Sequence, residues 1–210
     1  MLKAVFLDKD GTIVKDVPYN VNPDLITFEP DVPEALSRLQ RSGYALVVVT
    51  NQSGVARGYF DEKDLIRMLD NLRDKLWKMG VGLNAIYFCP HHPCGIVDKY
   101  RKRCECRKPD PGLLIRAAHD HGIDLSNSWM IGDILNDVEA GNRAGCRSIL
   151  IDNGNETEWL SGEFRAPDYK VNNLARAVDI ILAADKISEH EHNANNNNSA
   201  LPEQEGPRYR

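Results

Sequence analysis

Two aspartates stand two residues apart near the start of the chain, directly after an apolar run. Asp8 and Asp10 follow residues 4–7, which read Ala-Val-Phe-Leu, and Gly11 comes next. A short apolar run that ends in a charged, glycine-containing turn is typical of a buried strand in a parallel sheet. Side chains two apart on an extended segment share a face. The pair could therefore hold a divalent metal ion or act as a nucleophile beside a proton donor; two solvated loop acids are the alternative.

A second pair of acids lies much later in the chain. Asp133 follows a short apolar segment, and Asp137 comes four residues later, one helical turn away. Positions four apart on a helix face the same way. Together with Asp8 and Asp10, these acids would make an oxygen-rich cluster, and oxygen is the ligand that Mg2+ prefers. Asp133 could also be the N-cap of the helix, and the two roles are compatible.

Residues 50–54 offer phosphate-binding groups in a turn after an apolar strand. They read Thr-Asn-Gln-Ser-Gly and supply hydroxyls, amides and backbone N–H groups. Such donors suit the oxygens of a phosphate, and Arg57 is near enough in sequence to join an anion site. The alternative is an ordinary turn followed by a surface arginine.

A second anion-binding segment lies at residues 107–112, which read Arg-Lys-Pro-Asp-Pro-Gly. Two cations precede a helix here, and the positive end of the helix dipole also favours an anion. Lys108 could offset charge on a transferring phosphoryl group, and Arg107 could contact a more distant phosphate. The alternative is that residues 99–108 are a basic surface run.

Four of the five cysteines fall between residues 89 and 106, with histidines among them. In a reducing compartment such clustering indicates a metal before a disulfide. Three thiolates and one imidazole can make a tetrahedral structural zinc site, and the intervening loop has little apolar content to order it otherwise. The predicted ligands are Cys89, His91, Cys104 and Cys106, with His92 and Cys94 as possible substitutes.

The elements that must position these groups alternate between strands and helices. We predict strands over residues 4–7, 44–49, 85–88, 129–131 and 147–151, and helices over residues 31–42, 61–79, 110–121, 133–144 and 174–184. This alternation indicates an α/β fold with a parallel sheet covered by helices on both faces. Ligands bind such sheets outside the carboxyl ends of the strands. Asp8, Thr50, Cys89 and Asp133 would then lie along one edge.

Composition narrows the class of protein. The chain has 31 acidic and 26 basic residues and a net charge of -5, which argues against a general nucleic-acid-binding surface. It has no apolar run long enough to span a bilayer and no signal-peptide pattern, so we expect a cytoplasmic protein without a membrane partner. We predict one domain over residues 1–187 and a disordered polar tail over residues 188–210.

Taken together, these blocks resemble the haloacid dehalogenase (HAD) superfamily of phosphohydrolases. Its four motifs match residues 8–12, Thr50, Lys108 and residues 132–137, and the resemblance covers residues 1 to about 185. More narrowly, the chain resembles the branch that acts on heptose bisphosphates, with histidinol-phosphatase domains next in pattern. The segments that carry this likeness are residues 50–58, 89–93 and 104–109. The resemblance implies a Rossmann-like HAD fold with no separate cap domain and a zinc loop at residues 89–106.

The resemblance also implies roles for individual residues. Asp8 would attack phosphorus to form an aspartyl-phosphate, and Asp10 would protonate the leaving oxygen and then activate water. Mg2+ would be held by Asp8, Asp133 and the backbone carbonyl of Asp10, with Asp137 nearby. The residues expected to bind the reacting phosphate and the rest of the substrate are Thr50, Asn51, Gln52, Ser53, Arg57, Arg107 and Lys108.

The main functional hypothesis is a monomeric, Mg2+-dependent and zinc-stabilised phosphatase that removes the C7 phosphate of a small phosphorylated sugar, a heptose 1,7-bisphosphate. Histidinol phosphate is the alternative substrate within the superfamily. A zinc-dependent nucleic-acid-binding module that uses residues 99–108 is the alternative of a different class, and the net acidity opposes it. The anomer of the sugar is left open.

Overall fold

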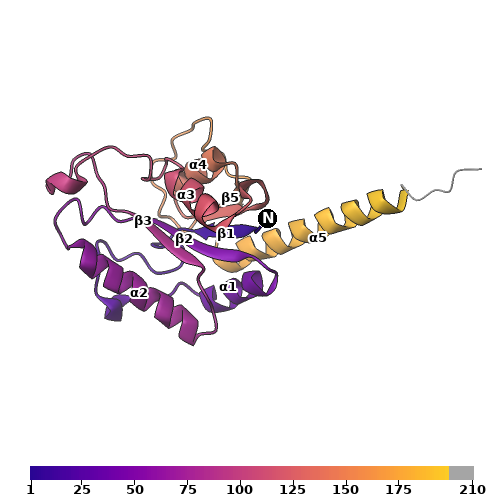
Figure 1. Ribbon diagram of the computed structural model, residues 1–210, viewed down its shortest axis with the longest axis horizontal. Helices are drawn as coiled ribbons and strands as arrows, with labels where there is room; N and C mark the ends of the chain where they lie inside the picture. Colours follow the sequence, from indigo (N-terminus) through magenta and orange to yellow (C-terminus); the bar gives the residue numbers. More distant parts are fainter. Residues whose placement is uncertain (199–210) are drawn as a thin grey trace, which may run out of the picture. The chain divides into compact units, whose positions relative to one another are not determined.

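A six-stranded parallel sheet with strand order β3-β2-β1-β4-β5-β6 forms the centre of the computed structural model, which describes residues 1–198 and the side chains of residues 1–187 (Figure 1). Its strands are β1 (Ala4–Leu7), β2 (Ala45–Asn51), β3 (Ala85–Cys89), β4 (Trp129–Gly132), β5 (Arg147–Ile151) and β6 (Tyr169–Val171). Every residue of β1 is buried. Such continuous apolar strands are expected where a parallel sheet is covered on both faces.

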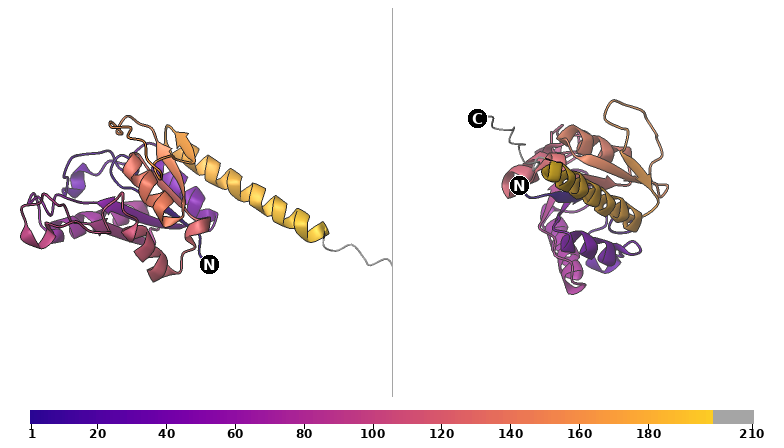
Figure 2. Two further views of the ribbon diagram at one scale, coloured as in Figure 1. Left: turned by 90° about the horizontal axis from the view of Figure 1, so that it is seen from above. Right: turned by 90° about the vertical axis from the view of Figure 1, so that its right-hand side faces the viewer.

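The helices that cover the sheet are α1 (Val32–Arg41), α2 (Glu62–Lys78), α3 (Gly112–His121) and α4 (Leu135–Ala144). Helices α1 and α2 lie on one face, and α3 and α4 lie on the other (Figure 1). The right-hand view of Figure 2 shows the same separation between the purple α1 and α2 and the orange α4. Side chains of β1 alternate accordingly: Ala4 and Phe6 pack in one cluster with Leu114 of α3 and Ala140 of α4. The predicted α/β class with helices on both faces is confirmed.

Most predicted elements are present, with differences at their ends. Strand β2 continues to Asn51, two residues further than predicted, and β6 was not predicted at all. Strand β6 has only three residues, two of them exposed, so it carries no apolar run. Asp31 occupies the N-cap position of α1 with a left-handed backbone, φ of 62°, and its side chain makes no capping hydrogen bond. Asp61 does cap α2, since its side chain accepts a hydrogen bond from the N–H of Asp64.

The chain forms two compact units, residues 1–178 and residues 179–210. The last helix, α5 (Leu174–Asn198), belongs to both and runs past the predicted end at Ala184. This segment contains no proline or glycine, so nothing in it breaks a helix. Helix α5 covers the first part of the predicted disordered tail, and residues 199–210 lie outside the described residues. No helix in the described part of the chain combines the length and the hydropathy that a membrane crossing requires.

Strand order brings distant parts of the sequence together at the carboxyl edge of the sheet. Strand β1 lies between β2 and β4, and Leu7 is paired with Val48 on one side and Ile131 on the other. The carboxyl ends of these three strands therefore lie next to one another. Asp8 and Asp133 come directly after β1 and β4, and Thr50 is the second-to-last residue of β2. The sequence predicted that these three residues share one edge.

Candidate active site

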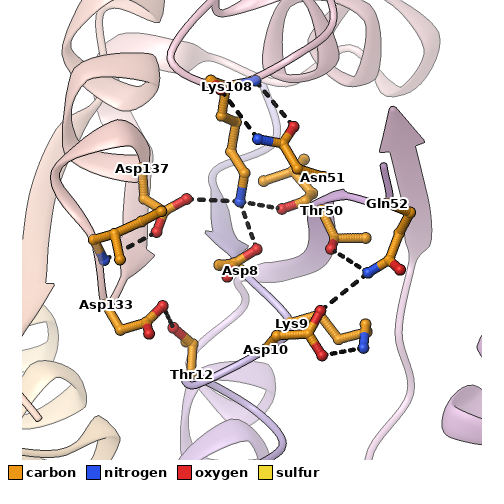
Figure 3. A network of polar contacts seen from close by, with 12 residues as sticks. Asp8, Lys9, Asp10, Thr12, Thr50, Asn51, Gln52, Lys108, Asp133 and Asp137 are labelled. Atoms are coloured by element: carbon orange, nitrogen blue, oxygen red, sulfur yellow. Dashed lines mark hydrogen bonds and ion pairs between the residues drawn. The ribbon is translucent and has the colours of Figure 1, made fainter. Parts of the chain in front are cut away.

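Lys108 lies at the centre of a buried network of charges at this edge (Figure 3). Its Nζ forms ion pairs with Asp8 and, at 2.6 Å, with Asp137 Oδ1, and it donates a hydrogen bond to the Val49 carbonyl at 2.8 Å. The side chains of Lys108 and Asp137 are 2% and 0% exposed, and that of Asp8 is 11% exposed. The structure thus joins three of the predicted motifs through one ammonium group.

Burial and charge shift the pKa values in this network. Burial raises the pKa of Asp8 well above its usual value, the positive charge of Lys108 opposes this, and the neighbouring aspartates add to it. Burial acts to lower the pKa of Lys108, but the charges of Asp137 and Asp8 outweigh it and the pKa is raised. Lys108 therefore stays protonated, and its positive charge stabilises an anionic Asp8. An ionised Asp8 is the form needed for attack on phosphorus.

Asp10 lies beside Asp8 but has different partners. Its Oδ1 pairs with Lys9, and its Oδ2 accepts a hydrogen bond from Nε2 of Gln52 at 3.0 Å. The same Nε2 also donates to the Thr50 hydroxyl oxygen at 2.9 Å. Gln52, which the sequence predicted as a substrate-binding residue, thus connects the predicted general acid to the predicted phosphate-binding threonine.

Asn51 holds the backbone of Lys108. Its Nδ2 donates to the Lys108 carbonyl at 3.0 Å, and its Oδ1 accepts from the Lys108 N–H at 3.1 Å. Both polar groups of this side chain are therefore occupied by the protein. The prediction that Asn51 faces the substrate stays a prediction, while its contacts show that it positions the lysine segment.

The acidic groups of the site can accommodate a divalent cation. Asp8, Asp133 and Asp137 are buried, and each offers an oxygen within 4.8 Å of the others. Burial, followed by the charge of Asp137, raises the pKa of Asp133 to about 6. With Asp10 the site holds four carboxyl groups against the two ammonium groups of Lys9 and Lys108, so the acids outnumber the cations. This excess of buried oxygen ligands and charge fits Mg2+.

Glycines allow the close approach of these acids. Gly11 has φ of 77°, and a Cβ there would lie 2.1 Å from Oδ2 of Asp133. A Cβ on Gly132 would lie 2.2 Å from the carboxylate of Asp137. Asp137 also caps α4 by accepting a hydrogen bond from the N–H of Ile134, the N-cap residue. The alternative in which Asp133 is the N-cap is therefore wrong.

The predicted zinc ligands meet in one cluster. Cys89 Sγ is 3.2 Å from Cys106 Sγ and 3.5 Å from Cys104 Sγ, and His91 Nδ1 is 3.3 Å from Cys106 Sγ. A tetrahedron with Zn–S bonds of about 2.3 Å has edges of about 3.8 Å, close to these separations. Contact with Cys89 is the main cause that lowers the pKa of the Cys106 thiol to about 5. Three sulfurs and one ring nitrogen in this arrangement fit Zn2+, whereas Cys94 is exposed and lies outside the cluster.

The zinc cluster is connected to the site by short stretches of backbone. The Cys89 carbonyl accepts a hydrogen bond from the N–H of Gln52 at 2.8 Å. Cys106 is followed after one residue by Lys108, which Asn51 clamps. A metal that fixes the cysteines would therefore also fix both phosphate-binding segments.

A pocket of about 400 Å³ opens above the network. Besides predicted residues that include Ser53, it is lined by Asp16, Tyr19 and Asn155, which sequence reasoning missed. The first two belong to the loop after β1, in which the sequence singled out no residue beyond Thr12. Asn155 belongs to the loop between β5 and β6, and no motif marked it.

Arg57 and Arg107 lie outside the residues that line this pocket. Within the described residues, Arg57 Nε and Arg107 Nη1 are buried without a hydrogen-bond partner. Arg57 Nη2 is 3.2 Å from Nε2 of His92. Burial, then the charges of Arg57 and Arg107, lowers the pKa of His92. The three side chains form a cationic cluster, which we call the Arg57–His92–Arg107 cluster.

Sequence comparisons give named relatives. A family profile described as HAD-hydrolase-like matches residues 105–177. A Yersinia pestis protein named D-glycero-beta-D-manno-heptose-1,7-bisphosphate 7-phosphatase is 40% identical over 180 residues, which are 86% of this chain and 95% of the relative. A Photorhabdus laumondii protein of the same name is 47% identical over 143 residues, 68% of this chain and 76% of the relative.

The fold is also similar to those of solved phosphatase structures. The D,D-heptose 1,7-bisphosphate phosphatase from B. bronchiseptica, solved with magnesium and phosphate, superposes with a TM-score of 0.75 at 32% identity and covers 87% of this chain and 99% of that one. A HAD-like phosphatase from Mesorhizobium loti has a TM-score of 0.74 at 33% identity, covering 86% of this chain and 87% of that one.

Proposed function

Because the chain belongs to the D-glycero-beta-D-manno-heptose-1,7-bisphosphate 7-phosphatase family of HAD-like hydrolases, we propose that it removes the C7 phosphate of that bisphosphate and leaves heptose 1-phosphate. The observation that carries the proposal is the buried Asp8 carboxylate, paired with Lys108 at the bottom of a polar pocket. An ionised carboxylate beside a fixed cation can attack phosphorus while the cation offsets charge on the phosphoryl oxygens.

In the first half of the reaction, a carboxylate oxygen of Asp8 forms a bond to phosphorus and the bond from phosphorus to the C7 oxygen breaks. Asp10 gives its proton to that oxygen, so the sugar leaves as an alcohol. Gln52 holds the Asp10 carboxyl through Oδ2 and keeps it beside the phosphate site. Lys108 and the Thr50 hydroxyl bind the oxygens of the phosphoryl group.

In the second half, Asp10 takes a proton from a water molecule whose oxygen attacks phosphorus. The bond between phosphorus and Asp8 breaks, inorganic phosphate leaves, and both aspartates return to their starting states. Asp8, Asp133 and the backbone carbonyl of Asp10 would hold Mg2+. When bound, Mg2+ supplies positive charge that stabilises the oxygens of the transferring group.

The second phosphate of the substrate requires a separate anion site. The Arg57–His92–Arg107 cluster supports this role, because two of its buried guanidinium nitrogens have no partner within the described residues. A guanidinium group can bind a phosphate through two parallel hydrogen bonds, which lysine cannot do. We propose that this cluster binds the C1 phosphate.

Arg107→Ala should therefore weaken binding of the bisphosphate more than it slows the chemical step. We expect KM to rise by about tenfold and kcat to change by less than about threefold, because the lost contact is equally present in the ground state and the transition state. The measurement is steady-state phosphate release. Arg116→Ala, which removes an exposed arginine of α3, is the matched control. A fall in kcat at unchanged KM would contradict the assignment.

We also propose that Zn2+ binds Cys89, His91, Cys104 and Cys106 as a structural ion. The enzyme is also proposed to work as a monomer. A cytoplasmic location is proposed because none of the five cysteines is in a disulfide, as expected in a reducing compartment.

The test of the proposed function is phosphorus NMR of the reaction products. The enzyme with Mg2+ should release the C7 phosphate from the beta anomer and leave the C1 phosphate in place. The alpha anomer and histidinol phosphate are the comparison substrates, and the beta bisphosphate should have the highest kcat/KM. Equal or faster hydrolysis of histidinol phosphate would instead assign the enzyme to that substrate. If the protein binds nucleic acid in a salt-sensitive way and releases no phosphate, the proposed phosphatase function would be refuted.

A further inference from the structure

Asn155 is a pocket residue whose side chain touches an acid of the candidate cation site. Its Nδ2 donates to Oδ2 of Asp133 at 2.7 Å, and the Thr12 hydroxyl donates to Oδ1 at 3.3 Å. Both oxygens of Asp133 are thus held by neutral donors. Each carboxylate oxygen can accept more than one contact, so these bonds fix the orientation of the group and still leave room for a cation.

The partners of Asp133 differ from those of the other buried acids. Asp8 and Asp137 share the positive charge of Lys108, which offsets part of their attraction for a metal ion. Asn155 contributes a hydrogen bond without a charge. Asp133 is therefore oriented while its negative charge remains available. Neutral groups that orient a ligand in this way usually contribute to metal affinity.

The loop that carries Asn155 is anchored at points other than Asp133. Asn153 Nδ2 donates to the Gly11 carbonyl at 2.8 Å, and Asn153 Oδ1 accepts from the N–H of Asn155 at 3.2 Å. Glu156 Oε2 accepts from the N–H of Leu135 at 2.6 Å. These contacts attach the loop to the turn after β1 and to the first turn of α4. Asn155 therefore does not need its bond to Asp133 to stay in place.

The contact between Asn155 and Asp133 requires a residue without a side chain at position 11. A Cβ on Gly11 would lie 2.4 Å from Nδ2 of Asn155 as well as 2.1 Å from Asp133. The absence of a side chain on Gly11 is therefore what allows the Asn155 amide to reach the carboxylate.

We propose that Asn155 is a positioning residue for the divalent cation, which it serves by orienting the carboxylate of Asp133. The loop between β5 and β6 then contributes to the cation site, together with the segments after β1 and β4. This inference rests on the proposed function, which supplies the cation.

The test measures cation binding directly, with Mn2+ as the probe and no substrate present. Electron paramagnetic resonance of free Mn2+ gives the dissociation constant for wild type, Asn155→Ala and Thr157→Ala. We expect a rise of about tenfold or more for Asn155→Ala. Thr157→Ala removes an exposed, uncharged polar group from the same loop, and its dissociation constant should rise by less than about threefold. Both side chains are exposed at the surface, so neither change should prevent folding.

The Mg2+ dependence of activity distinguishes a positioning role of Asn155 from a role in stability alone. In Asn155→Ala the Mg2+ concentration for half-maximal activity should rise by a similar factor, while kcat at saturating Mg2+ stays within about twofold. Equal Mn2+ binding by Asn155→Ala and wild type would overturn the inference. An equal loss in both variants would also overturn it, because the loop and not Asn155 would then be responsible. If the wild-type protein binds no Mn2+, the divalent cation in the proposed function would be refuted instead.

Discussion

Asp8→Asn is expected to reduce phosphate release by at least about 10⁴-fold, because the amide cannot form the bond to phosphorus on which both halves of the reaction depend. The change keeps the size of the side chain, so the fold should persist. Loss of the negative charge removes the ion pair with Lys108, but it also removes the cost of burying a charge beside other aspartates. These effects oppose each other, and we expect the melting temperature to move by only a few degrees.

Comparing Asp8→Asn with Asp10→Asn tests whether Asp8 is the nucleophile. The Asp10→Asn variant keeps Asp8 and should still form the phosphorylated enzyme, although slowly, while losing the base that activates water. Acid quench and mass spectrometry of the peptide that contains Asp8 should show the phosphoryl group in Asp10→Asn and not in Asp8→Asn. Mass spectrometry also checks that the introduced asparagine has not deamidated back to aspartate. Turnover by Asp8→Asn above about 1% of wild type would exclude Asp8 as the nucleophile.

The double variant Cys104→Ser, Cys106→Ser is expected to lose its zinc and with it the order of residues 89–106. Serine hydroxyls are poor zinc ligands, and the two remaining ligands, Cys89 and His91, cannot complete a tetrahedral site. The melting temperature should fall by on the order of 10 °C, because metal binding contributes folding free energy to such a loop. Activity should fall as well, since Lys108 follows this loop directly.

Zinc content is measured by elemental mass spectrometry and stability by calorimetry. Cys94→Ser is the matched control, because Cys94 lies in the same loop but is exposed and outside the cluster. It should retain zinc, melting temperature and activity. A double variant with the zinc content of wild type would refute the ligand assignment. Loss of zinc without any change in stability would show that the ion does not order the loop.

Local sequence patterns were sufficient for most of the fold. Apolar runs bounded by turns identified five of the six strands, and helical spacing of leucines identified α1 and α2. These patterns depend only on residues that are close in the sequence, so they can be recognised without the tertiary structure. Strand β6 was missed because its three residues carry no such pattern. The end of α5 was placed too early because no residue in the sequence marks it.

By itself the sequence also determined which acids and which cysteines would come together, because their types and spacing mark them as possible metal ligands. Only the tertiary structure decided how these side chains are paired. Lys108 contacts an acid 100 positions away, Asn51 holds the backbone of Lys108, and Asn155 reaches Asp133 from a loop that has no motif. The physical reason is that strand order selects which segments meet, whereas the path of each loop and the space left by Gly11 select which polar groups come within hydrogen-bonding distance.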